Sequence, residues 1–209
     1  ENVERLRQRG VYVAGPAVGH QASGLSGTGR LLETPELIGH ISLVLGLDGD
    51  LAGKKIVVSA GGTQEAIDPV RFITNRSSGK MGYAVAEAAR DRGAQVTLVA
   101  APTDIADPVG VGVVRVKSVL EMRDALGAEC SDADALVMAA AVADWRPVTT
   151  ATQKLKKGSA ENWSIKLTRT PDIVAELTGE QLIKVAFAAE TEDVISNAQA
   201  KIRSKGVHL

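Results

Sequence analysis

Residues 54–93 constrain the fold more than any other stretch, because they combine a strand pattern, a long polar connector and a helix pattern. An apolar, β-branched run ends at two consecutive glycines, as a buried strand of a parallel sheet does. A helical pattern begins near Gly79 and ends near Gly93, which suits a left-handed C-cap. We expect Ser77 or Ser78 to cap this helix. We expect its buried stripe to consist of Met81, Ala84, Val85, Ala88 and Ala89.

The connector between this strand and helix is unusually long for a βα unit and is rich in polar side chains. Open α/β sheets bind ligands beyond the carboxyl ends of their strands. The backbone N–H groups at the start of the following helix suit an anion such as phosphate. We therefore expect a ligand site here, near Thr63, Asp68, Arg71, Asn75, Ser77 and Ser78.

Strand and helix patterns alternate through the rest of the chain, which predicts an α/β fold. We expect a Rossmann-like, mostly parallel sheet with helices on both faces. Further strands are predicted at residues 95–101, 113–116, 134–142 and 184–189. Thr170 is the expected N-cap of a helix. Residues 154–157 and 163–167 are expected to pair as a small lysine-bearing flap.

Composition excludes several classes of protein. The chain has 209 residues and a formal net charge of −1, so its bulk charge favours neither nucleic acid nor an anionic membrane as partner. No apolar run is long enough to span a bilayer. The single cysteine, Cys130, allows no internal disulfide framework, and its helical spacing predicts a buried packing residue. We expect a cytoplasmic protein.

Two nucleotide-binding fingerprints are absent from the sequence. It contains neither GxGxxG after the first strand nor an acidic residue at the end of the second, which disfavours a nicotinamide oxidoreductase. It also lacks the P-loop pattern GxxxxGK[ST]. Asp144, just past a predicted strand, suits a ribose, a metal or a simple turn. Lys154 suits either phosphate binding or a solvated surface, whereas Lys201 and Lys205 suit either phosphate binding or the C-terminus of their helix.

Five segments, in order, resemble one enzyme family. They read AGGTQEAIDPVRFITNRSSGKMG, AAAVADWRP, KLKK, TPDIV and VAFAAET. The combination resembles the phosphopantothenate–cysteine ligase (phosphopantothenoylcysteine synthetase) domain of the bifunctional bacterial coenzyme A biosynthesis proteins. The resemblance covers residues 51–209, and residues 1–50 resemble the tail of a decarboxylase-like domain plus a linker.

The resemblance implies CTP-dependent ligation of 4′-phosphopantothenate to L-cysteine through an acyl-cytidylate. It also implies Mg²⁺ as cofactor, a homodimer of the ligase domain and a larger assembly in the full-length protein. In this family the motif asparagine, here Asn75, serves the acyl-cytidylate. The matching Arg71 is expected to bind phosphate or carboxylate, and Lys154 the triphosphate.

The resemblance further implies a set of nucleotide contacts, with Asp144 near both the ribose and the metal. Residues 138–140 are expected to act through their backbone. The expected contacts are Met138, Ala139, Ala140, Asp144, Lys154, Pro171, Asp172, Ile173, Val174, Phe187, Lys201 and Lys205.

The two ends of the chain carry separate expectations. Ser23 stands where many relatives of the decarboxylase domain carry a catalytic cysteine, and Leu31 replaces a methionine. The FMN site belongs to the part of that domain outside this chain, so we expect neither flavin binding nor decarboxylation here. Residues 206–209 resemble the start of another strand, and we expect further sequence beyond them. A non-catalytic nucleotide-binding fragment remains the alternative function.

Overall fold

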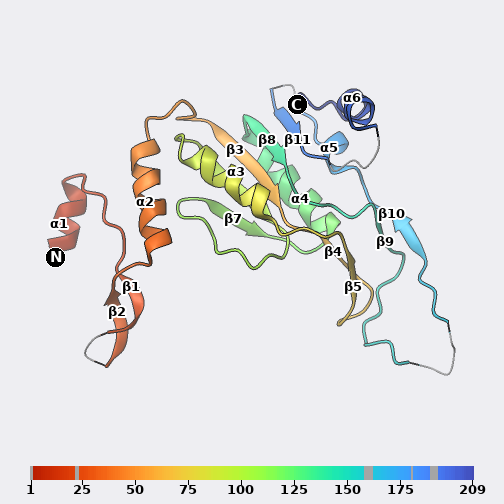
Figure 1. Ribbon diagram of the computed structural model, residues 1–209, viewed down its shortest axis with the longest axis horizontal. Coiled ribbons are helices and arrows are strands. Elements are labelled where there is room, and N and C mark those ends of the chain that lie inside the picture. Colours follow the sequence, from red (N-terminus) through yellow and green to blue (C-terminus); the bar gives the residue numbers. More distant parts are fainter. Residues whose placement is uncertain (1, 22–23, 158–161, 180, 189–192) are drawn as a thin grey trace.

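The computed structural model describes residues 2–21, 24–157, 162–179, 181–188 and 193–209. Its centre is a five-stranded sheet in the order β11-β8-β3-β6-β7, in which every neighbouring pair is parallel (Figure 1). Along the chain, β3 is the first strand of this sheet, β6 and β7 follow on one side of it, and β8 and β11 lie on the other side. The strands are β3 (Lys55–Ala60), β6 (Gln95–Ala100), β7 (Gly112–Arg115), β8 (Ala135–Met138) and β11 (Ile183–Ala186). The strand order therefore reverses between β3 and β8, which is where such sheets bind ligands.

Helices cover both faces of the sheet, as the sequence predicted. Helix α3 (Lys80–Arg90) packs on one face, where Tyr83, Ala86 and Ala89 meet apolar side chains of β3 and β6. Helix α4 (Val119–Glu129) and the short α5 (Ile173–Glu176) pack on the other face. Because consecutive strand residues point to opposite faces, β3 contributes to both apolar cores. The Rossmann-like architecture is confirmed.

The predicted buried stripe of α3 is wrong except at Ala89. Met81, Ala84 and Ala88 are exposed and Val85 is half-buried, whereas the buried residues are Gly82, Tyr83, Ala86, Ala89 and Arg90. Gly82 decides this orientation, because a Cβ there would lie 2.6 Å from the Cβ of Ala60 in β3. The helix thus approaches the strand through its glycine face.

The ends of α3 also differ in part from expectation. Gly79 is the N-cap, with a left-handed φ of 75° that favours glycine. The Ser77 and Ser78 hydroxyls accept hydrogen bonds only from the N–H groups of Gly79 and Lys80, at 3.3 and 3.5 Å. The left-handed conformation predicted at Gly93 is present, with φ of 92°.

The long polar connector forms an antiparallel hairpin that the sequence analysis did not predict. Strand β4 (Gln64–Ala66) pairs with β5 (Phe72–Thr74). Glu65 of β4 is buried, and its Oε1 accepts a hydrogen bond from the Val119 N–H at the start of α4, at 2.9 Å. The hairpin is therefore fixed to the body of the sheet at its base.

The flap is paired differently from the prediction. Strand β9 (Trp145–Pro147) pairs antiparallel with β10 (Leu167–Arg169), so Trp145 lies opposite Arg169. The lysine run 154–157 lies in the long loop that joins these strands, outside any strand. The expected pairing of residues 154–157 with 163–167 is therefore wrong, but the flap does carry the lysines.

Helix α4 is capped by a serine, and the cap of α5 differs from the prediction. Ser118 caps α4 by accepting a hydrogen bond from the Glu121 N–H at 3.3 Å. At α5 the N-cap is Asp172 rather than Thr170. Thr170 instead donates its hydroxyl to the carbonyl of Ala143 at 2.7 Å, which ties the start of α5 to the segment after β8.

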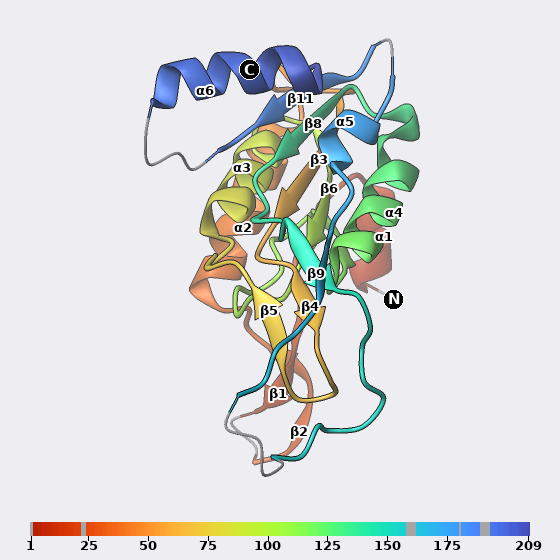
Figure 2. The same ribbon diagram turned by 90° about the vertical axis from the view of Figure 1, so that its right-hand side faces the viewer.

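The last helix leads into a carboxyl end that is expected from the sequence to begin a strand, but residues 207–209 are not assigned to one. Helix α6 (Val194–Lys205) ends at Gly206 in the left-handed conformation. The following residues lie along β11, because the His208 N–H donates to the Lys184 carbonyl and the Ala186 N–H to the Leu209 carbonyl. In the view of Figure 2, α6 lies beside the β11 edge of the sheet.

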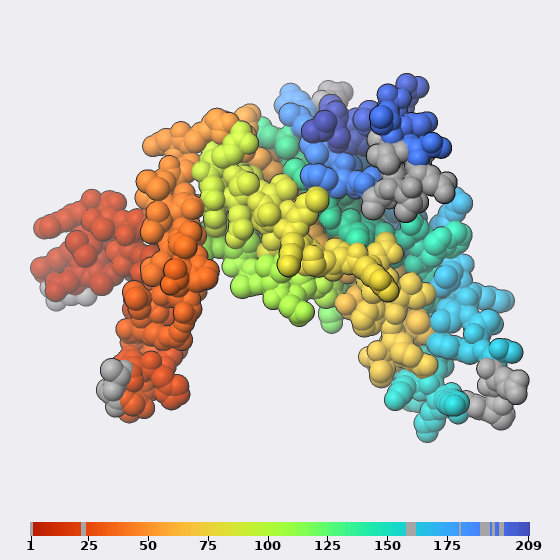
Figure 3. Space-filling view, in the orientation of Figure 1, coloured from red at the N-terminus to blue at the C-terminus, as the bar shows by residue number. Residues whose placement is uncertain are grey.

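The amino-terminal elements project from the sheet, at the opposite end from the flap (Figures 1 and 3). They are α1 (Asn2–Gln8), the hairpin of β1 (Ala17–His20) and β2 (Ser26–Arg30), and α2 (Thr34–Gly46). Ser23 lies outside the described residues. In the described part of the chain, no helix combines the length and apolarity that a membrane crossing requires.

Cys130 is buried, as its helical spacing predicted. Its side chain packs in the core on the α4 face of the sheet. Burial raises the pKa of the Cys130 thiol to about 11. A thiol in this state is a packing residue rather than a nucleophile.

Candidate active site

A cavity of about 690 Å³ opens beyond the carboxyl ends of β8 and β11. Its other walls come from the base of the flap, α5 and α6. It contains ten of the twelve predicted nucleotide contacts, all but Ala139 and Lys154. These ten are Met138, Ala140, Asp144, Pro171, Asp172, Ile173, Val174, Phe187, Lys201 and Lys205. Residues more than sixty positions apart in the sequence thus line one cavity.

The cavity has basic side chains on one wall and apolar ones on another. Lys201 and Lys205 project from α6, one turn apart. Lys205 Nζ lies 3.0 Å from Asp172 Oδ2, while Asp172 Oδ1 accepts the Ala175 N–H at 3.3 Å. Ile173 and Val174, at the start of α5, contribute buried apolar side chains to the lining. Ammonium groups beside an apolar wall suit a ligand that has both phosphates and a flat ring.

The backbone after β8 is held by Ser59. The Ser59 hydroxyl accepts hydrogen bonds from the N–H groups of Ala139 and Ala140, at 3.2 and 3.1 Å. The Met138 carbonyl accepts the N–H of Phe187 at 3.0 Å. A ligand that uses these two alanine N–H groups must therefore share them with Ser59 or displace it.

Asp144 lines the cavity and is exposed. Its carbonyl accepts the Thr170 N–H at 3.0 Å, which joins the two segments at the cavity edge. The described residues contain no cluster of three or more histidine, cysteine or acidic side chains that could hold a metal by themselves. Mg²⁺ commonly binds through one or two carboxylates plus substrate phosphates and water. Asp144 therefore fits as the protein carboxylate of a nucleotide-bound Mg²⁺.

Asn75 does not line the cavity but lies directly behind its edge. Asn75 Nδ2 donates to the carbonyl of Val142, a lining residue, at 2.9 Å. The same region is bound to the β3 side by Thr63, whose hydroxyl accepts the Ala143 N–H at 3.0 Å. Thr63 is fully buried, so this connection is protected from water. The asparagine amide is thus placed at the reversal point of the sheet.

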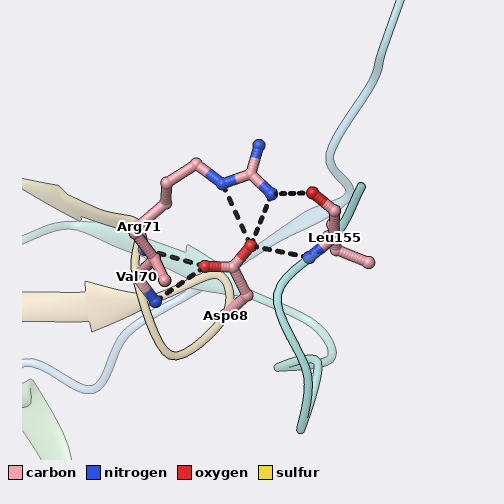
Figure 4. A network of polar contacts seen from close by, with 4 residues as sticks. All are labelled: Asp68, Val70, Arg71 and Leu155. Atoms are coloured by element: carbon pink, nitrogen blue, oxygen red, sulfur yellow. Dashed lines mark hydrogen bonds and ion pairs between the residues drawn. The ribbon is translucent and has the colours of Figure 1, made fainter. Parts of the chain in front are cut away.

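Arg71 lies apart from this cavity and contacts Asp68. Its Nε and Nη2 donate to Asp68 Oδ2 at 3.0 and 2.5 Å, and Nη2 also donates to the Leu155 carbonyl at 2.7 Å (Figure 4). Arg71 lines a second cavity of about 430 Å³, together with Phe72, Lys117 and Arg146. Strand β9 separates the two cavities, because Trp145 lines the first and the next residue lines the second.

Lys154 is exposed in the flap loop and lies outside the linings of both cavities. The structure therefore brings together the α5, α6 and β8 residues and leaves Lys154 and Arg71 apart from them.

Nine lining residues were not predicted from the sequence, and Arg169 and Trp145 are the two with the largest side chains among them. Arg169 lies at the cavity with its guanidinium 5.6 Å from the ring centre of Trp145. Both side chains come from strands so short that no periodicity marks them. The available signal was their position, because Trp145 follows Asp144 and Arg169 precedes the helix-start motif.

Comparison with known proteins decides the family. Residues 51–209 match the DNA/pantothenate metabolism flavoprotein C-terminal domain family. The chain belongs to this family. The whole chain aligns at 47% identity with the coenzyme A biosynthesis bifunctional protein CoaBC of Vibrio parahaemolyticus, of which it covers 53%. It aligns at 48% identity with CoaBC of Mycobacterium tuberculosis, of which it covers 54%. The chain thus spans about half the length of these curated relatives.

A solved structure agrees with the family. The crystal structure of the C-terminal domain of CoaBC superimposes with a TM-score of 0.67 at 42% sequence identity. The superposition covers 75% of this chain and 75% of that one. The family resemblance and the fold predicted from sequence are both confirmed.

Proposed function

We propose that this chain is the phosphopantothenate–cysteine ligase part of a coenzyme A biosynthesis protein and uses CTP. The observation that carries the proposal is the composition of the first cavity. Ten of the twelve residues expected to contact the nucleotide line it, and they come from β8, α5, β11, α6 and the segments beside them. A chance surface hollow would not gather residues of three of the five ordered motifs together with two lysines of α6.

The proposed nucleotide lies with its phosphates toward α6. Lys201 and Lys205 supply positive charge there, and Lys205 exchanges its ion pair with Asp172 for a phosphate oxygen. The base packs near Phe187 and the apolar start of α5. Mg²⁺ neutralises phosphate charge when it is bound, and Asp144 is the residue that would hold it.

The proposed reaction has two steps. A carboxylate oxygen of 4′-phosphopantothenate attacks the α-phosphorus of CTP, an O–P bond forms, and the α–β bridge breaks to release pyrophosphate. The amine of L-cysteine then attacks the acyl carbon and a C–N bond forms. The bond between the acyl carbon and the phosphate oxygen breaks, CMP leaves with that oxygen, and the amine loses a proton. Neither step requires a protein nucleophile, so positioning and charge stabilisation suffice.

The remaining predicted residues contact the acyl-cytidylate, the triphosphate and phosphopantothenate. The Asn75 amide donates toward the acyl-cytidylate, from its position behind Val142. Lys154 reaches the triphosphate when the part of the flap loop next to Leu155 turns toward the cavity. Arg71 binds the phosphate or carboxylate of phosphopantothenate. A homodimer of the ligase domain, and a larger assembly of the full-length protein, belong to the same proposal.

Product analysis tests this function. The protein is incubated with Mg²⁺, 4′-phosphopantothenate, L-cysteine and either CTP or ATP, and the amide product and nucleoside monophosphate are quantified. The proposal predicts one CMP for each amide formed and far less product with ATP. CTP binding without turnover would favour a non-catalytic nucleotide-binding module. Preferential binding of a nicotinamide dinucleotide would favour an oxidoreductase.

A further inference from the structure

The Asp68 carboxylate accepts hydrogen bonds from its own turn and also from a distant segment of the chain. Its side chain is fully buried. Oδ1 accepts the N–H groups of Val70 and Arg71, each at 2.8 Å. Oδ2 accepts Nε and Nη2 of Arg71 and the N–H of Leu155, the last at 3.1 Å. A buried carboxylate with this many donors is fixed in a single orientation.

The network connects two segments that are far apart in the sequence. Asp68 and Arg71 belong to the turn between β4 and β5, whereas Leu155 belongs to the flap loop (Figure 4). Both backbone groups of Leu155 are used, because its N–H donates to Asp68 and its carbonyl accepts from Arg71. Leu155 directly follows Lys154.

Other contacts attach the same loop to the same hairpin. The Ala151 N–H donates to the Ile67 carbonyl at 2.9 Å, and the Thr150 hydroxyl donates to the Ala66 carbonyl at 3.0 Å. On the returning arm of the loop, the ring centre of Trp163 lies 4.8 Å from the Arg71 guanidinium. The flap loop is thus attached on both sides of the lysine run.

We infer that Asp68 is a positioning residue that acts on the ligase site through Lys154. It fixes the backbone of Leu155 to the β4–β5 hairpin. The neighbouring Lys154 therefore turns about this fixed residue and does not move with the whole flap loop. This inference rests on the proposed function, in which Lys154 binds the triphosphate. Without the anchor, Lys154 samples many positions, and each productive encounter with the nucleotide costs more conformational entropy.

A double-mutant cycle tests the inference. The variants are Asp68→Asn, Lys154→Gln and the combination, with kcat/KM for CTP as readout. We expect each single variant to lower kcat/KM roughly 10- to 100-fold. We expect the double variant to have the same kcat/KM as the less active of the two single variants. Losses that multiply would show that Asp68 acts independently of Lys154, and wild-type kinetics of Asp68→Asn would show that it does not act at all. Either result overturns the inference.

The matched control is Asp50→Asn. Asp50 also accepts Nε and Nη2 of one arginine, Arg92, but on the exposed surface beside the amino-terminal elements. We expect wild-type kcat/KM for this variant. A loss equal to that of Asp68→Asn would mean that any broken Asp–Arg pair suffices, which would overturn the specific role of Asp68.

Hydrogen exchange at the Leu155 amide separates failure of this inference from failure of the proposed function. We expect faster exchange in Asp68→Asn than in wild type or Asp50→Asn, whether or not the protein forms product. Unchanged exchange at Leu155 would overturn the anchor. If Asp68→Asn does not fold, Leu155→Pro removes the same N–H donor without changing Asp68, and it is expected to give the same kinetic loss.

Discussion

Lys205 and Asp172 form an ion pair of 3.0 Å that joins the last turn of α6 to the N-cap of α5. Both side chains line the first cavity. Lys205 is about one-third exposed, so its ammonium group is accessible to a ligand while the ion pair holds it at the cavity. A phosphate with more than one negative charge competes well with a single carboxylate for such a group.

Replacement of Lys205 by methionine keeps an unbranched side chain of similar length and removes its charge. We expect Lys205→Met to weaken CTP binding about tenfold, equivalent to about 1.4 kcal/mol. Isothermal titration calorimetry at fixed Mg²⁺ measures this. The control is Lys54→Met, because Lys54 pairs with Asp134 at 2.9 Å at the opposite end of the strands. Equal CTP affinities in the two variants would remove Lys205 from the nucleotide site.

Asn75 should affect chemistry rather than nucleotide binding. In Asn75→Asp a carboxylate replaces the amide that donates to the Val142 carbonyl, so the donor is lost and a negative charge is added beside the acyl group. We expect CTP affinity within a factor of about three and kcat lower by roughly 100-fold. Steady-state kinetics and calorimetry together separate the two. The remote variant Asn2→Asp, on α1, should match wild type in both.

Lys184 is predicted to stabilise the fold around the cavity. It is buried, and its Nζ donates to the carbonyls of Val174 and Leu177 at 3.0 Å and of Lys205 at 3.3 Å. It thus joins the carboxyl ends of α5 and α6, where a cation is favourable. We expect Lys184→Met to lower the free energy of unfolding by roughly 3 kcal/mol, because the carbonyls lose a charged donor. Urea denaturation measures this, and a loss no larger than that of exposed Lys80→Met would refute it.

Asp68 gives a pH dependence of definite sign. The Arg71 guanidinium, helped by the N–H groups around it, holds the pKa of the Asp68 carboxyl well below its usual range, although burial alone would raise it. A depressed pKa stabilises the folded state above the unfolded pKa of about 4, and this stabilisation is lost as the pH falls below that value. Wild type should therefore be more stable than Asp68→Asn at pH 7, and the difference should shrink below pH 4. Urea denaturation of both proteins across this range would contradict the account if the difference stayed constant.

The sheet and most of the cavity were predictable because their signals are local. β-branched runs that end at glycines or polar residues identify buried strands, and the helix patterns between them indicate a parallel sheet. The expected nucleotide contacts came from ordered motifs, and Pro171, Asp172, Ile173 and Val174 do lie together at the cavity. The family resemblance, rather than periodicity, supplied those residues.

The rest depended on contacts between distant segments, which periodicity does not encode. The strands of β4, β5, β9 and β10 have three residues each, too few to show an alternating pattern. The buried face of α3 was set by the close approach of Gly82 to β3, against the pattern of larger apolar residues. The role of Asp68 becomes visible only when Leu155 is seen beside it.

Pyrophosphate release in the absence of cysteine tests the central claim most directly. The protein is mixed with CTP and Mg²⁺, with or without 4′-phosphopantothenate, and pyrophosphate is measured before and after L-cysteine is added. The account predicts release that depends on phosphopantothenate and precedes cysteine, followed by CMP and amide once cysteine is present. No phosphopantothenate-dependent release from folded protein that binds CTP would contradict it.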